Sequence, residues 1–242
     1  MSTARGRKSL CFIHGFLGAK EDWEKIIAFL QEDFFCHAID LPGHGDSPFS
    51  ENFLEAVATQ LKMLKPFPEY FVGYSLGGRI LLQLNEQYPS LLKHLIILSS
   101  HPGLETQEEK HARWKEDAYW IEILKTKPFS AFFDAWYGQP LFQSLKENKQ
   151  VFDEMLQRRK KQNPFALARV LQKCSLTHQV RLSIFPNTIF LYGEKDLKFQ
   201  TLYRKLPSFV KVHQIQKCGH ALHLENPEGC SAIIRGYLHA SS

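Results

Sequence analysis

The sequence lacks any apolar run that approaches the ~20 residues needed to cross a membrane as a helix. Its basic first residues are followed by neither the long apolar segment nor the small-residue cleavage site of a secretory signal peptide. The five cysteines are odd in number and include no Cys-x-x-Cys pair, which indicates neither a disulfide framework nor a zinc site. We therefore predict a cytoplasmic protein with reduced thiols, no metal, no cofactor and no membrane partner.

A large excess of charge of one sign is also missing. The 242 residues contain 30 Lys and Arg against 25 Asp and Glu, and the densest basic run covers only residues 158–161. Because so short a run cannot follow a nucleic-acid backbone, we expect no nucleic-acid partner, and the net charge of +5 favours an acidic small molecule instead. The 44% hydrophobic and 23% charged residues are typical of a globular protein, with one large domain or a core domain carrying an insertion.

Short apolar runs alternate with helical patterns in the first hundred residues and again near the end of the chain. The runs predict strands at residues 10–13, 34–39, 70–73, 92–98, 188–192 and 210–215. Apolar residues at helical spacing predict helices at residues 23–30 and 53–64, from residue 76, and at 199–206 and 228–238. Because such alternation is typical of a parallel sheet with helices on both faces, we predict an α/β fold.

Residues 101–185 interrupt this alternation, because they favour several helices with no strand between them. A helical block between two strands of a parallel sheet predicts a cap over the carboxyl ends of the strands, where such sheets place their sites. We therefore expect a core made of residues 1–100 and 186–242, with a helical cap at residues 101–185 inserted before the last two strands.

The segment Gly73-Tyr74-Ser75-Leu76-Gly77 joins a predicted strand to a predicted helix. In a Gly-x-Ser-x-Gly elbow the serine lies on a sharp, strained turn, and the small residues around it let strand and helix approach closely. The hydroxyl then projects near a helix N-terminus, whose free N–H groups favour a developing negative charge. We predict Ser75 as the catalytic serine, although the pentapeptide alone also fits a glycine-rich turn with a surface serine.

Asp196 and His220 each follow a predicted strand downstream of Ser75, which gives the order Ser, Asp, His of a catalytic triad on this architecture. In such a triad His220 takes the proton from Ser75, and Asp196 fixes the tautomer of His220 and stabilises the imidazolium. Glu194 is an alternative acid, but its position closer to the strand favours capping or pairing.

The end of the first predicted strand carries His14-Gly15-Phe16, which fits an oxyanion-hole loop. The backbone N–H groups of Phe16 and Leu76 would then hold an oxyanion together. The exposed amide matters more here than the side chain.

These motifs, with residues 40–45 (DLPGHG), resemble the α/β-hydrolase superfamily, which implies the α/β-hydrolase fold. A longer set, spread over nearly the whole chain, resembles one family within it, the 2-succinyl-6-hydroxy-2,4-cyclohexadiene-1-carboxylate synthases of menaquinone biosynthesis. Its stretches are residues 72–79 (VGYSLGGR), 101–104 (HPGL), 136–140 (WYGQP), 193–199 (GEKDLKF) and 219–227 (GHALHLENP).

The resemblance implies a lyase, whose triad removes a proton from 2-succinyl-5-enolpyruvyl-6-hydroxy-3-cyclohexene-1-carboxylate before pyruvate is eliminated. That substrate carries three carboxylates, which guanidinium groups bind in bidentate fashion. The positions that match those the family uses around its substrate are Tyr74, Arg79, Arg113, Trp136, Tyr137, Arg159 and Lys198. The spacing from Pro140 differs by one residue, so Arg158 is an alternative; we favour Arg159 because it stands four residues before Asn163-Pro164, as in relatives.

Two other functions fit the same triad. One is a serine carboxylesterase, for example one that cleaves the methyl ester of a pimeloyl-carrier-protein conjugate, and the other is a catalytically inactive binding protein on a hydrolase fold. An esterase for a neutral acyl chain is expected to have apolar residues where this chain has Arg79 and Arg113, and the intact triad disfavours an inactive protein. We expect a small polycarboxylate substrate and a monomer or weak oligomer.

Overall fold

A single six-stranded parallel sheet forms the centre of the molecule. The computed structural model describes residues 7–179 and 181–240, so most of the basic N-terminal segment considered above lies outside it. In the order β2-β1-β3-β4-β5-β6, the strands are Phe35–Ile39, Ser9–Ile13, Tyr70–Tyr74, His94–Leu98, Thr188–Gly193 and Lys211–Ile215. The inner strands are almost continuously apolar because helices cover both of their faces, whereas the edge strands β2 and β6 include exposed residues.

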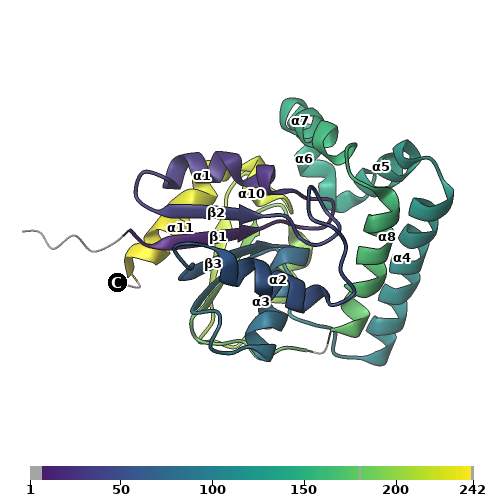
Figure 1. The fold of residues 1–242 in the computed structure, drawn as a ribbon. Helices are drawn as coiled ribbons and strands as arrows, with labels where there is room; N and C mark the ends of the chain where they lie inside the picture. The colour runs from purple at the N-terminus through teal and green to yellow at the C-terminus, as the bar shows by residue number, and fades with distance from the viewer. Residues whose placement is uncertain (1–6, 180, 241–242) are drawn as a thin grey trace, which may run out of the picture.

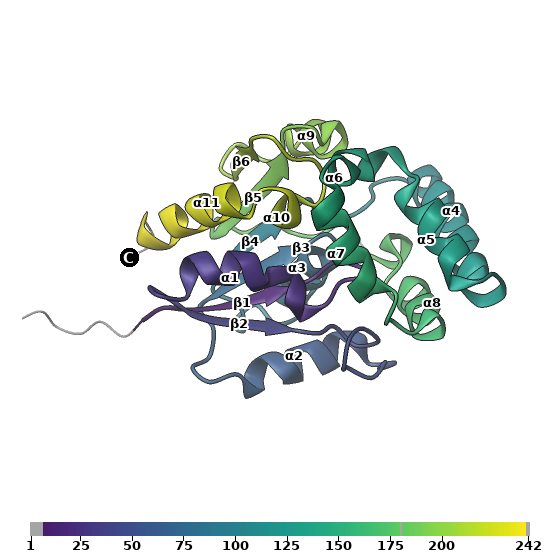
Figure 2. The same cartoon turned by 90° about the horizontal axis from the view of Figure 1, so that it is seen from above.

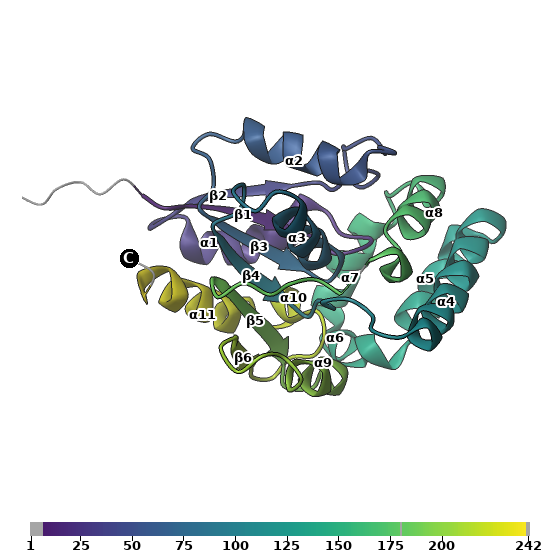
Figure 3. The same cartoon turned by 90° about the horizontal axis from the view of Figure 1, so that it is seen from below.

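Alternate residues of each strand point into two separate cores. Leu10 and Phe12 belong to the core under α1 (Glu24–Leu30) and α11 (Pro227–Ala240). Cys11 and Ile13 belong to the core under α2 (Phe53–Met63), α3 (Leu76–Gln87) and α9 (Leu197–Tyr203). The sheet is therefore the middle layer of three, as Figures 1 and 3 show from two sides.

Among the described residues between β4 and β5, five helices stand beyond the carboxyl ends of the strands (Figures 1 and 2), and we refer to them as the cap helices. They are α4 (Gln107–Thr126), α5 (Phe129–Tyr137), α6 (Gln143–Glu147), α7 (Lys149–Arg159) and α8 (Pro164–Lys173). Side chains cap the N-termini of three of these helices. A Thr106–Glu109 capping box precedes α4, Asn148 caps α7 and Asn163 caps α8. The described part of the chain also contains three 3-10 turns, at Lys20–Trp23, Pro140–Phe142 and Leu176–His178.

The predicted α/β alternation is confirmed, and each predicted strand is present within two residues at either end. The predicted helix at residues 199–206 is displaced, because α9 is Leu197–Tyr203: the Asp196 carboxylate accepts the Phe199 N–H and starts the helix earlier. The short helix α10 (Leu222–Glu225) was not predicted, since four residues are too few to show a helical period.

Within the described ranges, no helix combines the length and apolar character that crossing a bilayer requires. All five cysteines lie in the described part of the chain, and none of them is disulfide-bonded.

Candidate active site

Ser75 lies in the sharp turn between β3 and α3, with φ 49° and ψ −109°. This backbone conformation is strained for any residue with a side chain. A Cβ atom on Gly73 would lie 2.7 Å from the Cα of Gly78, and one on Gly77 would lie 2.4 Å from the carbonyl oxygen of Ile13. The close packing of β3, α3 and β1 around Ser75 therefore requires glycine at both motif positions.

Asp196 and His220 form a buried pair behind the serine. The Nδ1 of His220 donates to the Asp196 Oδ2 at 2.9 Å, and the Ser99 hydroxyl donates to the same oxygen at 3.3 Å. The other Asp196 oxygen accepts the Phe199 N–H at 3.2 Å. With three donors around it, the carboxylate is fixed in place, and the His220 Nε2 is left as the proton acceptor. Glu194 instead lies exposed and accepts the Lys217 N–H at 2.9 Å.

Ser75 and His220 line the same cavity at the carboxyl ends of the strands. Among the described residues, no hydrogen bond joins the Ser75 hydroxyl to His220. Of the predicted triad, the structure therefore shows the His220–Asp196 hydrogen bond, with Ser75 at the same cavity. Such catalytic hydrogen bonds are often long before substrate binds and shorten in the complex. Phe199, Phe142 and Tyr74 surround the His220 ring at centroid distances of 5.1, 6.1 and 5.3 Å.

The other predicted site residues gather around the same cavity. Its lining includes Phe16, Tyr74, Leu76, Arg79, Arg113, Trp136, Tyr137, Arg159 and Lys198, whereas Asp196 lies behind His220 and Arg158 is not among the described lining residues. The geometry therefore places Arg159 rather than Arg158 at the cavity. In residues 7–179 and 181–240, no group of three His, Cys, Asp or Glu side chains is placed to hold a metal ion.

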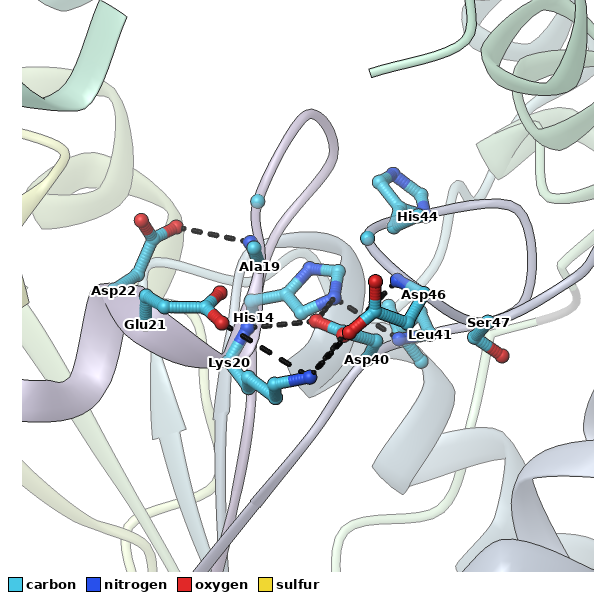
Figure 4. Close-up of polar contacts among 12 residues, drawn as sticks. His14, Ala19, Lys20, Glu21, Asp22, Asp40, Leu41, His44, Asp46 and Ser47 are labelled. Carbon is cyan, nitrogen blue, oxygen red and sulfur yellow. Dashed lines mark hydrogen bonds and ion pairs between the residues drawn. The ribbon is translucent and has the colours of Figure 1, made fainter. Parts of the chain in front are cut away.

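Two backbone amides at the cavity remain available for an oxyanion. Leu76 is the first residue of α3, where an N–H group has no partner within its own helix. We call the loop after β1 the oxyanion loop (residues 15–20). Its Leu17 amide donates to the His44 ring and its Gly18 amide to the Gly15 carbonyl. The Ala19 amide donates to the Asp22 carboxylate and the Lys20 amide to the Asp40 carboxylate. Figure 4 shows the Asp22 and Asp40 carboxylates beside Ala19 and Lys20. The Phe16 amide donates to no described group.

His14 and His44 connect the oxyanion loop with the loop after β2. The His14 Nε2 accepts the Leu41 N–H at 2.9 Å (Figure 4). Its Nδ1 therefore carries the proton and donates to the Gly15 carbonyl. In the opposite direction, the His44 Nε2 accepts the Leu17 N–H at 3.2 Å. Burial lowers the pKa of both imidazoles and keeps them neutral. Both histidines belong to motifs quoted above, but sequence reasoning assigned no role to either side chain.

Arg79 brings to the cavity a buried positive charge that no described carboxylate pairs with directly, although Asp117 lies close enough to act on it. It lies in the first turn of α3, its side chain is buried, and its Nη1 donates to the Cys174 carbonyl at 2.9 Å. Burial, together with the nearby Arg113 cation, lowers the pKa of Arg79 to about 10, so the guanidinium is still charged at neutral pH. It forms no ion pair with a carboxylate of any described residue. A buried charge without an ion-pair partner favours an anionic ligand at this position.

Two other cavity arginines are paired with carboxylates. Arg113 forms a 2.8 Å ion pair with the buried Asp117 one helical turn further along α4. Arg159, at the end of α7, forms a bidentate pair with the buried Asp22, in which Nη1 lies 3.0 Å from Oδ1. Arg158 reaches the same oxygen of Asp22 at 3.3 Å. Sequence reasoning missed Asp22, which lies 137 residues from Arg159 and matches no motif.

His101 is a partly buried cavity residue with a lowered pKa. Burial and the cations Lys198, Arg79 and Arg113 lower its pKa to about 4. Its Nδ1 accepts the Gly103 N–H at 3.1 Å, so the neutral ring carries its proton on Nε2. The sequence places His101 in a family motif but gives it no function.

Removing the Asp22 carboxylate should destabilise the fold and change how its stability depends on pH. Burial alone would raise the pKa of Asp22, but the Arg159 charge outweighs burial and lowers the pKa to about 2. The stability that the pair contributes is therefore complete above the ordinary carboxyl pKa near 4 and is lost as the pH falls toward about 2. We expect D22N to lower the free energy of unfolding at neutral pH by about 3–5 kcal/mol, because it leaves Arg159 buried without a partner.

Denaturant unfolding of wild type and D22N across the acid range measures both effects. The exposed Glu51–Arg169 pair supplies the control, since E51Q should change stability by no more than about 1 kcal/mol. Equal stability of D22N and wild type at neutral pH would contradict the importance given to this pair.

Comparison with known proteins finds a matching family and relatives that cover most of the chain. Residues 8–227 match a family model described as the alpha/beta hydrolase fold. The chain is 35% identical to a 2-succinyl-6-hydroxy-2,4-cyclohexadiene-1-carboxylate synthase of Enterobacter sp. (strain 638), over 93% of this chain and 89% of that protein. It is 34% identical to a protein of the same name from Escherichia coli O1:K1, over 93% and 91% of the two chains.

Solved structures show the same relationship. The structure of MenH from S. aureus superposes with a TM-score of 0.88 at 25% identity, covering 98% of this chain and 95% of that one. A thermophilic esterase from Thermogutta terrifontis superposes with a TM-score of 0.78 at 19% identity, over 96% and 90% of the two chains, which shows a shared fold only.

Proposed function

Because the chain belongs to the 2-succinyl-6-hydroxy-2,4-cyclohexadiene-1-carboxylate synthase family of α/β-hydrolase-fold enzymes, we propose that it carries out the lyase reaction of that name. Its substrate would be 2-succinyl-5-enolpyruvyl-6-hydroxy-3-cyclohexene-1-carboxylate, from which a proton is removed and pyruvate is eliminated. The product is the conjugated cyclohexadiene of menaquinone biosynthesis.

The buried, unpaired Arg79 is the observation that supports this proposal most directly. The substrate has three carboxylates, and a guanidinium without a carboxylate partner is a preformed site for one of them. A neutral ester would offer this charge no compensation. An esterase for a neutral acyl chain therefore has no use for Arg79, although it would need the same serine.

The triad residues would act as the base. The Ser75 oxygen takes the substrate proton as the Ser75 hydroxyl gives its own proton to the His220 Nε2, while Asp196 holds the His220 Nδ1–H and stabilises the imidazolium that results. The negative charge that develops on the substrate as an enolate is held by the amides of Phe16 and Leu76. Cleavage of the C–O bond between the ring and the enolpyruvyl group then forms the diene and releases the enolate of pyruvate, which takes up the proton held by His220 and becomes pyruvate.

The remaining cavity residues would hold the carboxylates and the ring. Arg79 and Lys198 supply charge not engaged in any described ion pair, and Arg113 and Arg159 supply the N–H donors that their carboxylate partners leave free. Tyr74, Trp136 and Tyr137 would form the aromatic wall, in which Trp136 lies 5.3 Å from the Phe16 ring.

Other features of the protein follow from the same proposal. The enzyme acts on a small molecule, and we propose that it works in the cytoplasm as a monomer or weak oligomer. Residues 101–185 would form a cap over a core of residues 1–100 and 186–242. The cap would close the cavity over the substrate.

Replacing Arg79 tests the proposal. R79M should raise the KM for pyruvate release by roughly thirtyfold or more, because losing one partner of a buried charge pair costs about 2–5 kcal/mol. The variant should be at least as stable as wild type, since methionine removes a buried charge that has no ion-pair partner. Hydrolysis of neutral p-nitrophenyl butyrate should change little.

The matched control is R169M, which removes an exposed arginine outside the cavity and should leave all three measurements unchanged. Wild-type protein that releases no pyruvate, or an R79M variant with an unchanged KM, would contradict the proposed function.

A further inference from the structure

We propose that Gln162 is a positioning residue that holds the oxyanion loop in its active conformation, a role that rests on the oxyanion site proposed above. Gln162 lies between α7 and α8 and is nearly buried. Its Nε2 donates to the Gly18 carbonyl at 2.9 Å, and its Oε1 accepts the Gly45 N–H at 2.9 Å. One amide thus joins the cap helices to the oxyanion loop and to the loop after β2.

The two backbone groups that Gln162 binds determine how its amide is oriented. The Gly18 carbonyl can only accept and the Gly45 N–H can only donate, so one orientation of the side-chain amide satisfies both. Few side chains have a donor and an acceptor at this spacing. A carboxylate has no donor, and a methionine of similar shape has neither.

The Gly18 carbonyl belongs to the turn that presents the Phe16 amide. The Gly18 N–H donates to the Gly15 carbonyl at 2.9 Å, which closes the turn over residues 15–18. Leu17 within this turn has a φ of 66°, a left-handed conformation that a leucine rarely adopts. Such a conformation persists only where its surroundings hold it. Gln162 from the cap and His44 from the loop after β2 are two of those restraints.

The same end of α7 binds the segment that follows the oxyanion loop. Arg158 and Arg159 both pair with Asp22, whose carboxylate also accepts the Ala19 N–H at 3.3 Å. The cap helices therefore hold both the oxyanion loop, at Gly18, and the segment that follows it, at Asp22. A shift of the α7–α8 corner would move the Phe16 amide relative to Ser75, and misplacing a catalytic group by about 1 Å can cost a hundredfold in rate.

The test uses two variants of Gln162 and one matched control. Q162M removes both hydrogen bonds, whereas Q162E keeps the acceptor for Gly45 but loses the donor to Gly18. Gln60 is the control, because its Nε2 donates to the Asp40 carbonyl and the Ser47 hydroxyl in the loop after β2 and does not contact the oxyanion loop. Each protein is assayed for pyruvate release and for p-nitrophenyl butyrate hydrolysis, and its melting temperature is measured.

We expect both Gln162 variants to lower kcat by about tenfold to a hundredfold in both reactions, with KM changed by less than about threefold. Q60M should keep the wild-type kcat. Wild-type kcat in Q162E would overturn the proposal, and so would an effect on KM alone, or an equal loss of kcat in Q60M.

The two reactions separate this inference from the proposed function. If the wild type hydrolyses the ester with a kcat that depends on Gln162 but releases no pyruvate, the lyase assignment fails and the role of Gln162 stands. If the wild type releases pyruvate and the Gln162 variants match it in both reactions, the lyase assignment stands and the role of Gln162 fails.

Discussion

S75A should lose at least a thousandfold in kcat for pyruvate release and keep a stability close to that of the wild type. The triad functions as a unit, and removing one member of such a triad costs several powers of ten in rate. The Ser75 hydroxyl forms no hydrogen bond with a described residue, and its removal leaves the strained turn as it is. Most of the cost should therefore fall on chemistry and little on folding.

S75G is the matched control for this prediction. Glycine tolerates the φ of 49° and ψ of −109° at this position, so S75G should be more stable than S75A and equally inactive. Pyruvate release is measured under saturating substrate and unfolding is followed by denaturant. Turnover near the wild-type value in either variant would show that Ser75 is not the base.

The sequence was sufficient to predict the parts of the site that depend on strand order. Ser75, Asp196 and His220 each follow a predicted strand, and the carboxyl ends of parallel strands meet at one edge of the sheet. The buried strands were recognisable because their apolar runs are short and continuous, and because glycine motifs mark their ends. The structure places all three side chains at or next to one cavity, while their catalytic roles stay predictions.

The contacts that shape the site could not be predicted in the same way. The Asp22–Arg159 pair and the Gln162–Gly18 bond join residues 137 and 144 positions apart, and neither follows from periodicity or a motif. The family motif placed Arg159 near the substrate, but only the structure shows that a buried carboxylate already engages it. The sequence also could not show that Arg79 lacks an ion-pair partner, because that depends on where every nearby carboxylate lies in the folded chain.

The choice between lyase and esterase depends on what the cavity stabilises in the transition state. Both reactions can use Ser75, His220 and the two amides, so slow hydrolysis of activated esters is expected from this protein. The cations around the cavity, with Arg79 buried and unpaired, match a polyanionic enolate and leave a neutral ester without a partner for the charge. This difference should appear in kcat/KM.

The most direct measurement compares kcat/KM for pyruvate release from 2-succinyl-5-enolpyruvyl-6-hydroxy-3-cyclohexene-1-carboxylate with kcat/KM for p-nitrophenyl butyrate and for a pimeloyl methyl ester. We expect the cyclohexene substrate to exceed both esters by at least about a hundredfold, which requires only ~2.7 kcal/mol of differential transition-state stabilisation. One ordered carboxylate–arginine pair can supply that much. Comparable values, or a preference for the methyl ester, would contradict the lyase assignment and favour the esterase.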